Sequence, residues 1–307
     1  MIKFYSFLLV TGFVLITFSK LNAQNIFPIN SIGTSAGSIG IGNIEGFSKS
    51  ANTLFENPAS LFTISTFSIS GFYSEFLMGD LKFNSISAAY RFPFGILGIG
   101  TMKLGIDTIP YTGTNAFNEF IELSQFAYTD QWTKLSFQNS LSEELNWGIS
   151  LVNYSKSLKD LSGSGWNVDS GLFLKYPQFS ASFTARNILA GQKMIYSNGS
   201  KENLPLQIVC GISGKLGWFD IYGQLKTGWS SPKFLKSIGA KFQPKFLGDL
   251  FYLSSGISES EVFDQIKSNF SIGTGLDLGG IQTHFAYQPS EYFGQFSQYY
   301  FSAAINF

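Results

Sequence analysis

Hydrophobic and polar side chains alternate at the carboxy-terminal end of the chain, residues 299–307. With a period of two, Tyr299, Phe301, Ala303, Ile305 and Phe307 share one side of an extended strand. The other side carries Tyr300, Ser302, Ala304 and Asn306, which are polar or small. The pattern predicts a strand with one apolar face, and this strand ends the chain on an aromatic residue with no polar tail.

The same alternation begins after Leu61 and continues along most of the chain. It predicts about fourteen strands of roughly 9 to 13 residues, the length that a tilted strand needs to cross a bilayer. The strands lie near residues 67–73, 85–92, 96–106, 134–141, 147–151, 166–175, 179–186, 206–212, 219–229, 234–242, 250–257, 270–278, 281–287 and 299–307. Residues 96–106 are apolar on both faces and rich in Gly, which favours either a gap in the wall or close packing.

The connections between these strands are of two kinds. Short turns are predicted near Phe94, Glu143, Pro177, Lys215, Lys245 and Gly279. An even number of strands puts all of these turns on the same side as the two chain ends. Loops are predicted at 107–130, 157–165 and 191–203, and the first and last of these fall on the opposite side, an asymmetry typical of outer-membrane barrels.

The amino end has the composition of a secretory signal. Lys3 precedes a short apolar run from Phe4 to Phe18, and a small residue, Ala23, closes the segment. The run is short for a membrane span of about 20 residues. We therefore expect export and cleavage after Ala23 rather than an anchor, and the fold is predicted without residues 1–23.

Composition favours a membrane barrel over a soluble domain. Only 13% of the residues are charged, whereas 17% are aromatic, 33 of them Phe, and the formal net charge is zero. A soluble domain is about one-quarter charged, and without a basic excess the chain is not expected to bind nucleic acid. No apolar run after the signal is long enough for a spanning helix, so a membrane fold requires closed strand pairing. We predict an all-β, transmembrane, antiparallel up-and-down β-barrel of about 14 strands.

Residues 24–61 lack clean alternation and form a separate unit before the first strand. A resemblance to the amino-terminal segment of the FadL/TodX outer-membrane porins for hydrophobic compounds is carried by Gly40, Gly42, Asn57, Pro58, Ala59 and Leu61. The chain departs from the usual pattern at Glu56, where a large residue is common, and at Ser60, where Gly is common. The resemblance implies that residues 24–61 fold as a hatch inside a barrel of residues 62–307.

Two other stretches extend this resemblance. Residues 169–188 and 204–206 look like the middle of the barrel in the shorter PorV/PorQ branch of the superfamily. The last strand resembles the closing strand of bacterial outer-membrane barrels. Its residues Tyr299, Phe301, Ile305 and Phe307 would then be the signal that the barrel-assembly machinery reads.

Charged residues within the strands fall mostly opposite the apolar face. In a barrel they face the lumen, because Lys or Arg on the lipid face costs about 2 to 4 kcal/mol at mid-depth. The lumen-facing candidates are Arg91, Lys134, Arg186, Asp220, Lys226 and Asp277, with Lys215 and Lys241 beside them. They are expected to bind the hatch or wet the interior rather than to form a substrate site. The tryptophans Trp132, Trp147, Trp166, Trp218 and Trp229 fall near strand ends, where interfacial girdles are expected.

The sequence offers little for catalysis or metal binding. His284 is the single histidine and is predicted to face the lumen, with no second member of a catalytic triad in view. Cys210 is the single cysteine, and we expect it to be a buried, inert thiol. No catalytic residue, metal site or cofactor is predicted.

Two functions follow from the resemblance. One is transport of small hydrophobic compounds through a hatch-blocked barrel, with release sideways through a gap in the wall. The other is a type IX secretion component that binds exported cargo proteins at the cell surface. Both imply an outer-membrane protein whose partners are lipid and the barrel-assembly machinery, together with either hydrophobic small molecules or secreted cargo.

Overall fold

The computed structural model describes residues 32–76, 80–227, 233–244, 246, 248, 250–262, 265–289 and 297–307. The expected signal peptide, residues 1–23, lies outside the described residues, as do Trp229 and Lys245. The N-terminal segment, here residues 32–66, contains the helices α2 (Ala36–Gly40) and α3 (Thr53–Glu56) and the 3-10 helix η2 (Pro58–Thr63). None of the described helices has the length and apolarity needed to cross a membrane.

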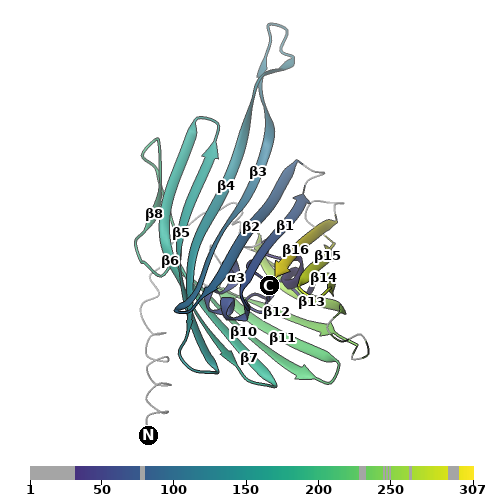
Figure 1. Cartoon of the computed structure of the whole chain (residues 1–307). Helices are drawn as coiled ribbons and strands as arrows, with labels where there is room; N and C mark the ends of the chain where they lie inside the picture. Colours follow the sequence, from purple (N-terminus) through teal and green to yellow (C-terminus); the bar gives the residue numbers. More distant parts are fainter. Residues whose placement is uncertain are drawn as a thin grey trace.

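The strands form one antiparallel sheet of 16, and all except the β8–β9 hairpin belong to a closed barrel (Figure 1). The barrel strands are β1 (Phe67–Phe76), β2 (Leu81–Phe92), β3 (Gly95–Thr114), β4 (Phe120–Ser140), β5 (Leu145–Leu158), β6 (Leu161–Lys175), β7 (Phe179–Arg186), β10 (Gln207–Leu216), β11 (Phe219–Thr227), β12 (Phe234–Phe242), β13 (Phe251–Val262), β14 (Gln265–Asp277), β15 (Ile281–Gln288) and β16 (Gln298–Asn306). Each pairs with the next along the chain, and β1 pairs with β16 to close the wall. The predicted fold class, a transmembrane barrel of 14 strands, is confirmed.

The wall is much taller on one side than the sequence indicates. β3 and β4 contain 20 and 21 residues and stay paired out to Thr114 and Phe120. The prediction of a loop at 107–130 is therefore wrong, and a two-stranded ribbon rises there instead (Figure 1). The loop expected at 157–165 is wrong too, because β5 and β6 pair up to Leu158 and Leu161. Within 191–203 lies the hairpin of β8 (Lys193–Tyr196) and β9 (Lys201–Asn203).

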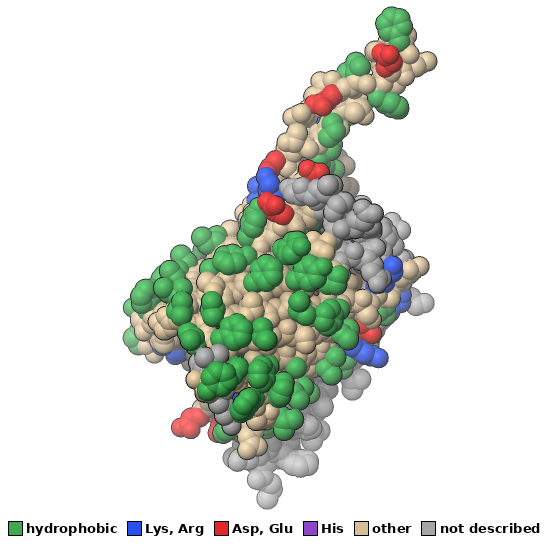
Figure 2. All heavy atoms as spheres, turned by 90° about the vertical axis from the view of Figure 1, so that its right-hand side faces the viewer, with side chains coloured by type: hydrophobic (Ala, Val, Ile, Leu, Met, Phe, Trp, Pro, Cys, Tyr) green, Lys and Arg blue, Asp and Glu red, His purple; other side chains and the backbone are tan. Residues whose placement is uncertain are grey.

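Side chains on the wall alternate between the outside and the lumen. Ile69 and Phe301 on neighbouring strands are exposed outside, whereas Ser70 and Ser302 are buried inside. Figure 2 shows apolar side chains spread over the outer wall below the ribbon. Outward side chains then become polar at Asn84, Lys103, Gln131 and Ser155, which are successive neighbours in the ladder. This row marks the end of the lipid-facing band on the tall side of the barrel.

Aromatic rings gather at the other end of the outer wall, near the short turns. Phe92 stacks on Phe94 with 5.2 Å between ring centroids, and Phe94 lies 6.5 Å from Phe137. Phe137 in turn contacts Trp147 at 5.8 Å. These rings occupy the position of an interfacial aromatic girdle.

Two expectations for single residues are wrong. Trp132 is only 4% exposed and packs on Tyr154 inside the lumen, with 4.9 Å between ring centroids. It lies in mid-strand because β4 begins at Phe120. Cys210 does alternate with the apolar residues of β10, but it is exposed on the outer wall and not buried in a core.

The glycine-rich strand at 96–106 leaves no gap in the wall. It pairs continuously with β2 from Gly95 to Ile106 and with β4 from Ile96 to Ile106. Its inward glycines serve close packing, because a Cβ on Gly100 would lie 2.7 Å from the Phe55 ring of the N-terminal segment.

The lipid-facing band can be tested with two isoleucines of equal exposure. Ile99 on β3 is 56% exposed well inside the band, and Ile195 on β8 is 56% exposed beyond it. We expect Ile99→Lys to lower the free energy of unfolding in bilayers by about 2 to 4 kcal/mol and Ile195→Lys to change it by less than about 0.5 kcal/mol. Urea unfolding in vesicles measures both values, and equal losses would contradict the assignment of the band.

Candidate functional site in the barrel lumen

The N-terminal segment packs along the inward faces of the strands (Figure 1). Local caps shape its short helices: the Ser35 hydroxyl accepts a hydrogen bond from the backbone N–H of Ser38 at 3.1 Å, at the start of α2. At the start of η2 the Asn57 side chain accepts one from the N–H of Ala59 at 2.9 Å, and Pro58 occupies the first turn. The Asn57 amide also donates to the Ser182 hydroxyl of β7 at 2.8 Å. The same residue therefore caps a helix and ties it to the wall.

Inward-facing glycines mark the path of the segment along the wall. On one side, the segment backbone at Ile41 and Gly42 passes directly over Gly239 of β12 and Gly256 of β13. On another side, a Cβ on Gly148 of β5 would lie 2.5 Å from the carbonyl carbon of Pro58. A glycine within a strand lets another backbone approach closely, and these positions use that freedom.

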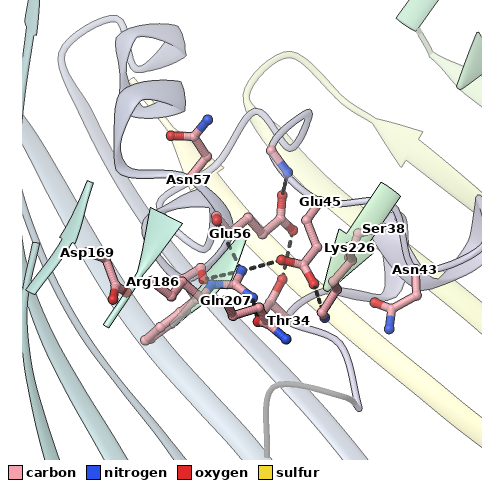
Figure 3. A network of polar contacts seen from close by, with 12 residues as sticks. Thr34, Ser38, Asn43, Glu45, Glu56, Asn57, Asp169, Arg186, Gln207 and Lys226 are labelled. Atoms are coloured by element: carbon pink, nitrogen blue, oxygen red, sulfur yellow. Dashed lines mark hydrogen bonds and ion pairs between the residues drawn. The ribbon is translucent and has the colours of Figure 1, made fainter. Parts of the chain in front are cut away.

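Glu45 is the centre of a buried ionic network (Figure 3). Its carboxylate accepts a hydrogen bond from Lys226 Nζ of β11 at 2.7 Å and another from Arg186 Nη2 of β7. The backbone N–H of Glu45 donates to the side chain of Gln224 at 2.8 Å. One residue of the segment thus bonds two separate strands, through both its side chain and its backbone.

Arg186 and Lys134 extend this network to α3. The Arg186 guanidinium donates to Gln207 Oε1 at 2.9 Å and to the backbone carbonyls of Phe55 and Glu56 at 3.2 and 3.1 Å. Lys134 forms an ion pair with Asp169 at 2.6 Å and also lies 3.4 Å from the Phe55 carbonyl. The last carbonyls of the short helix are therefore bound by cations, the charge that a helix carboxyl end favours.

Two buried carboxylates of the segment have opposite environments. Burial alone raises the pKa of Glu45, but the charges of Arg186 and Lys226 outweigh it and hold that pKa at about 2. Burial raises the pKa of Glu56, and its hydrogen bonds offset this only in part. Those bonds come from the Thr34 hydroxyl at 2.8 Å, the Gly46 N–H at 2.7 Å and the Ser48 hydroxyl at 2.8 Å. Glu45 therefore ties the segment to the wall, and Glu56 ties the segment to itself.

The structure places the predicted lumen-facing residues in two groups. Lys134, Arg186 and Lys226 come together in the buried network. Arg91, Asp220 and Asp277 lie apart from it, at or next to the ends of β2, β11 and β14 that are nearest the short turns. Arg91 donates to the Ile64 and Phe62 carbonyls, each at 2.8 Å, so it also contacts the segment.

The predicted hatch residues contact separate parts of the wall. Gly40 and Gly42 lie against β12 to β14, Asn57 to Ala59 lie against β5 to β7, and Leu61 lies against Gly98 of β3. Asn57, Ala59 and Leu61 have no exposed surface. The predicted assembly signal, Tyr299, Phe301, Ile305 and Phe307, lies on the exposed outer face of the terminal strand and the residue that follows it.

Apolar side chains line the lumen on the side of the network farthest from the short turns. On β1, β2 and β16, Phe72 lies 5.3 Å from Phe83 and 6.1 Å from Tyr300, measured between ring centroids. Farther along the same side of the wall, on β4 and β5, Trp132 packs against Tyr154. The buried cluster also includes Phe76, Met102, Leu104 and Met194. These side chains are at most 7% exposed, and they form one packed cluster with apolar residues of the N-terminal segment.

His284 faces the lumen, as its position in the alternation of polar and apolar residues predicts. It lies 2.7 Å from the Tyr252 hydroxyl through Nδ1, and Lys241 lies over the Tyr252 ring at 4.5 Å. The described residues contain no cluster of His, Cys, Asp or Glu that could hold a metal ion.

Sequence reasoning missed the segment's own half of the network. Glu45 was not expected to pair with Arg186 and Lys226, nor were the backbone carbonyls of Phe55 and Glu56 expected to accept hydrogen bonds from Arg186. On the wall, Asp169, Gln207 and Gln224 were not singled out as partners. The inward glycines carried a usable signal, because a glycine on the lumen parity of many successive strands indicates a backbone lying against the wall.

These features define a class: a closed membrane barrel of 14 strands with its own N-terminal segment packed in the lumen. The structure is similar to the P. putida toluene transporter TodX, with a TM-score of 0.64 and 13% sequence identity over 90% of this chain and 99% of that one. It is also similar to the Ralstonia pickettii toluene transporter TbuX (TM-score 0.60, 10% identity, 91% and 100% covered). A Pseudomonas aeruginosa FadL homologue gives a TM-score of 0.57 at 8% identity, with 92% and 99% covered. No protein-family model matches the sequence, and a search of the curated proteins finds no significant match.

Proposed function

We propose that this chain is a bacterial outer-membrane transporter for small hydrophobic compounds, with the N-terminal segment acting as a hatch. The observation that carries the proposal is the order of surfaces along the lumen. Apolar rings line the part of the lumen that is farthest from the short turns. Next to them, on the side of the short turns, the N-terminal segment is held by polar contacts to the wall. A hydrophobic compound that displaces these packed contacts buries its surface against the rings, whereas an ion or a sugar would lose its hydration there without gaining hydrogen bonds. The likeness of the fold to two toluene transporters supports the same class of substrate.

A sideways exit fits the irregular end of β7. β7 stops at Arg186, and Asn187 adopts a left-handed φ of 58°. The regular β6–β7 ladder ends at Ser170 and Ala185, beyond which the Ile188 N–H to Val168 carbonyl bond at 2.9 Å continues the contact. In this proposal the wall opens at this end of β7, where the Ile188–Val168 bond must break, and the compound leaves the lumen beside the cation that binds Glu45.

Uptake of radiolabelled toluene tests the proposal in host cells whose outer membrane otherwise excludes hydrophobic compounds. We expect the full chain to raise uptake several-fold and Phe72→Ser to abolish most of that gain, because a hydroxyl would replace a ring in the apolar lining. Tyr73→Ser is the matched control, since Tyr73 is the next residue on β1 and points outward. Heat-modifiable migration on gels shows that each variant is folded. Equal uptake with and without the chain would sink the proposal.

A second candidate function is surface binding of exported proteins as a type IX secretion component of the PorV/PorQ kind. It is favoured by the one-sided extension of the wall beyond the lipid-facing band, where β3 and β4 rise as a ribbon with exposed apolar residues. Pull-down of exported proteins from intact cells, run beside the toluene assay, separates the two functions.

A further inference from the structure

The ribbon, defined as residues 107–127 of β3 and β4 with their connection, stands clear of the membrane. Its strands leave the lipid-facing band at Lys103 and Gln131, which face each other in the ladder. Beyond this pair each strand continues for roughly 11 residues, to Thr114 on β3 and from Phe120 on β4, a reach of roughly 36 Å. Figures 1 and 2 show it rising above the rest of the molecule. Its tip is therefore out of reach of the headgroups around its own barrel.

The tip of the ribbon, residues 115–120, is a built turn. The Asn115 side-chain oxygen accepts hydrogen bonds from the N–H groups of Phe117 at 2.9 Å and Glu119 at 3.0 Å. The Asn115 amide donates to the Glu119 carboxylate at 2.9 Å, and the backbone N–H of Asn115 donates to the Glu119 carbonyl at 3.0 Å. Asn118 takes the left-handed φ of 58° that closes the turn. These bonds fix the tip before any partner arrives, which lowers the entropy lost on binding.

This fixed turn displays two aromatic rings to solvent. Phe117 is 82% exposed and Phe120 is 83% exposed, and Leu123 and Tyr111 continue the exposed apolar surface down the ribbon. Large exposed apolar side chains on a rigid support mark an interaction site, and aromatic anchors commonly carry much of the binding energy at interfaces.

The charge of the ribbon narrows the kind of partner. Residues 107–127 contain Asp107, Glu119 and Glu122 and not a single Lys or Arg. Asp107 at the base is paired with Lys82 at 2.8 Å, so the acids near the tip are Glu119 and Glu122. A cation of the same chain already packs on the ribbon, because Lys159 Nζ lies 3.7 Å from the centre of the Tyr111 ring.

We propose that the ribbon tip docks another protein at the cell surface, through an apolar pocket that receives Phe117 and Phe120 and a rim of Lys or Arg that faces Glu119 and Glu122. A second copy is disfavoured because two barrels in one membrane stand parallel and would bring like charges together. Lipid is disfavoured by the reach of the ribbon. The inference rests on the second candidate function and names its site; transport of hydrophobic compounds is independent of it.

Photo-crosslinking in cells that produce the full chain tests this site. The probe is p-benzoylphenylalanine in place of Ala116, which is exposed in the tip. The control places the same probe at Ile195, which is exposed on β8. We expect one discrete protein adduct from position 116, identified by mass spectrometry, and none of that protein from position 195. Phe117→Ala with Phe120→Ala should lower the yield at least tenfold, and Glu119→Gln with Glu122→Gln at least threefold.

Other outcomes overturn the proposal. These are no adduct, an adduct with lipid, an adduct of twice the mass of the chain, or a yield that the phenylalanine variants leave unchanged. Heat-modifiable migration shows that the barrel of each variant is folded. If the captured protein is not exported, the secretion function fails and the docking site stands. If the variant without both rings still pulls down exported proteins, the docking site fails and the secretion function stands.

Discussion

Replacing Glu45 with Gln is expected to open the lumen to small ions. The change keeps the shape of the side chain but leaves two buried cations, Arg186 and Lys226, without their shared countercharge. Breaking a buried ion pair from one side costs about 3 to 5 kcal/mol, and here that loss falls on the contact between segment and wall. Single-channel conductance in planar bilayers should therefore rise at least tenfold over the wild-type protein.

The controls for this variant come from the same chain. Lys82→Gln breaks the exposed ion pair with Asp107 and should leave conductance unchanged, because solvent screens an exposed pair and this one lies outside the lumen. Lys226→Met added to Glu45→Gln should recover part of the closure, since it removes one of the two uncompensated cations. A Glu45→Gln channel that stays closed would show that the network does not hold the segment.

The pH dependence of closure has a definite sign. The pKa of Glu45 falls from 4.5 to about 2 in the folded protein, so its contribution to stability is present above pH 4.5 and is lost as the pH falls toward 2. Wild-type channels should stay closed at pH 5 and open more often below pH 3. Conductance recorded over this range checks the expectation, and opening that begins near pH 5 would contradict it.

The sequence predicts the barrel well because lipid acts on one face of every strand. Hydrocarbon excludes polar side chains from the outside, while the filled lumen accepts Ser70 or Phe72 alike. The alternation is therefore strict only within the lipid-facing band. Residues 107–127 have water on both sides, so no solvent difference enforces an alternation of apolar and polar side chains there. These residues therefore have the composition of a loop although they form a regular ribbon. The misplacement of Trp132 follows from the same cause, because the start of β4 was hidden in that stretch.

The buried network is harder to predict than the wall that carries it. The alternation along each strand predicts which side of the wall Arg186 and Lys226 face, but it does not predict their binding partner. Glu45 lies 141 residues from Arg186 and 181 from Lys226 in the sequence, within a segment that has no period to place it. Local patterns predict strands. A contact between a strand and the irregular N-terminal segment depends instead on how the whole barrel closes.

Adding a single methyl group at Gly239 is expected to displace the segment. A Cβ at this position would overlap the backbone carbonyl of Ile41, and a Cβ on Gly256 of the next strand would overlap the Ile41–Gly42 peptide. Backbone cannot swing aside as a flexible side chain can. Gly239→Ala and Gly256→Ala should each lower the free energy of unfolding by about 1 to 3 kcal/mol, the usual effect of overpacking. Both should also raise bilayer conductance.

Gly223→Ala is the matched control for these two variants. Gly223 lies on β11 opposite Ile238, one residue before Gly239 on β12, but a Cβ there would meet nothing closer than the Ile212 side chain at 3.6 Å. The same methyl group is therefore added to the same region of wall without touching the segment. If all three variants behaved alike, the effect would belong to the strands themselves, and the close passage of the segment over Gly239 and Gly256 would have no part in closing the lumen.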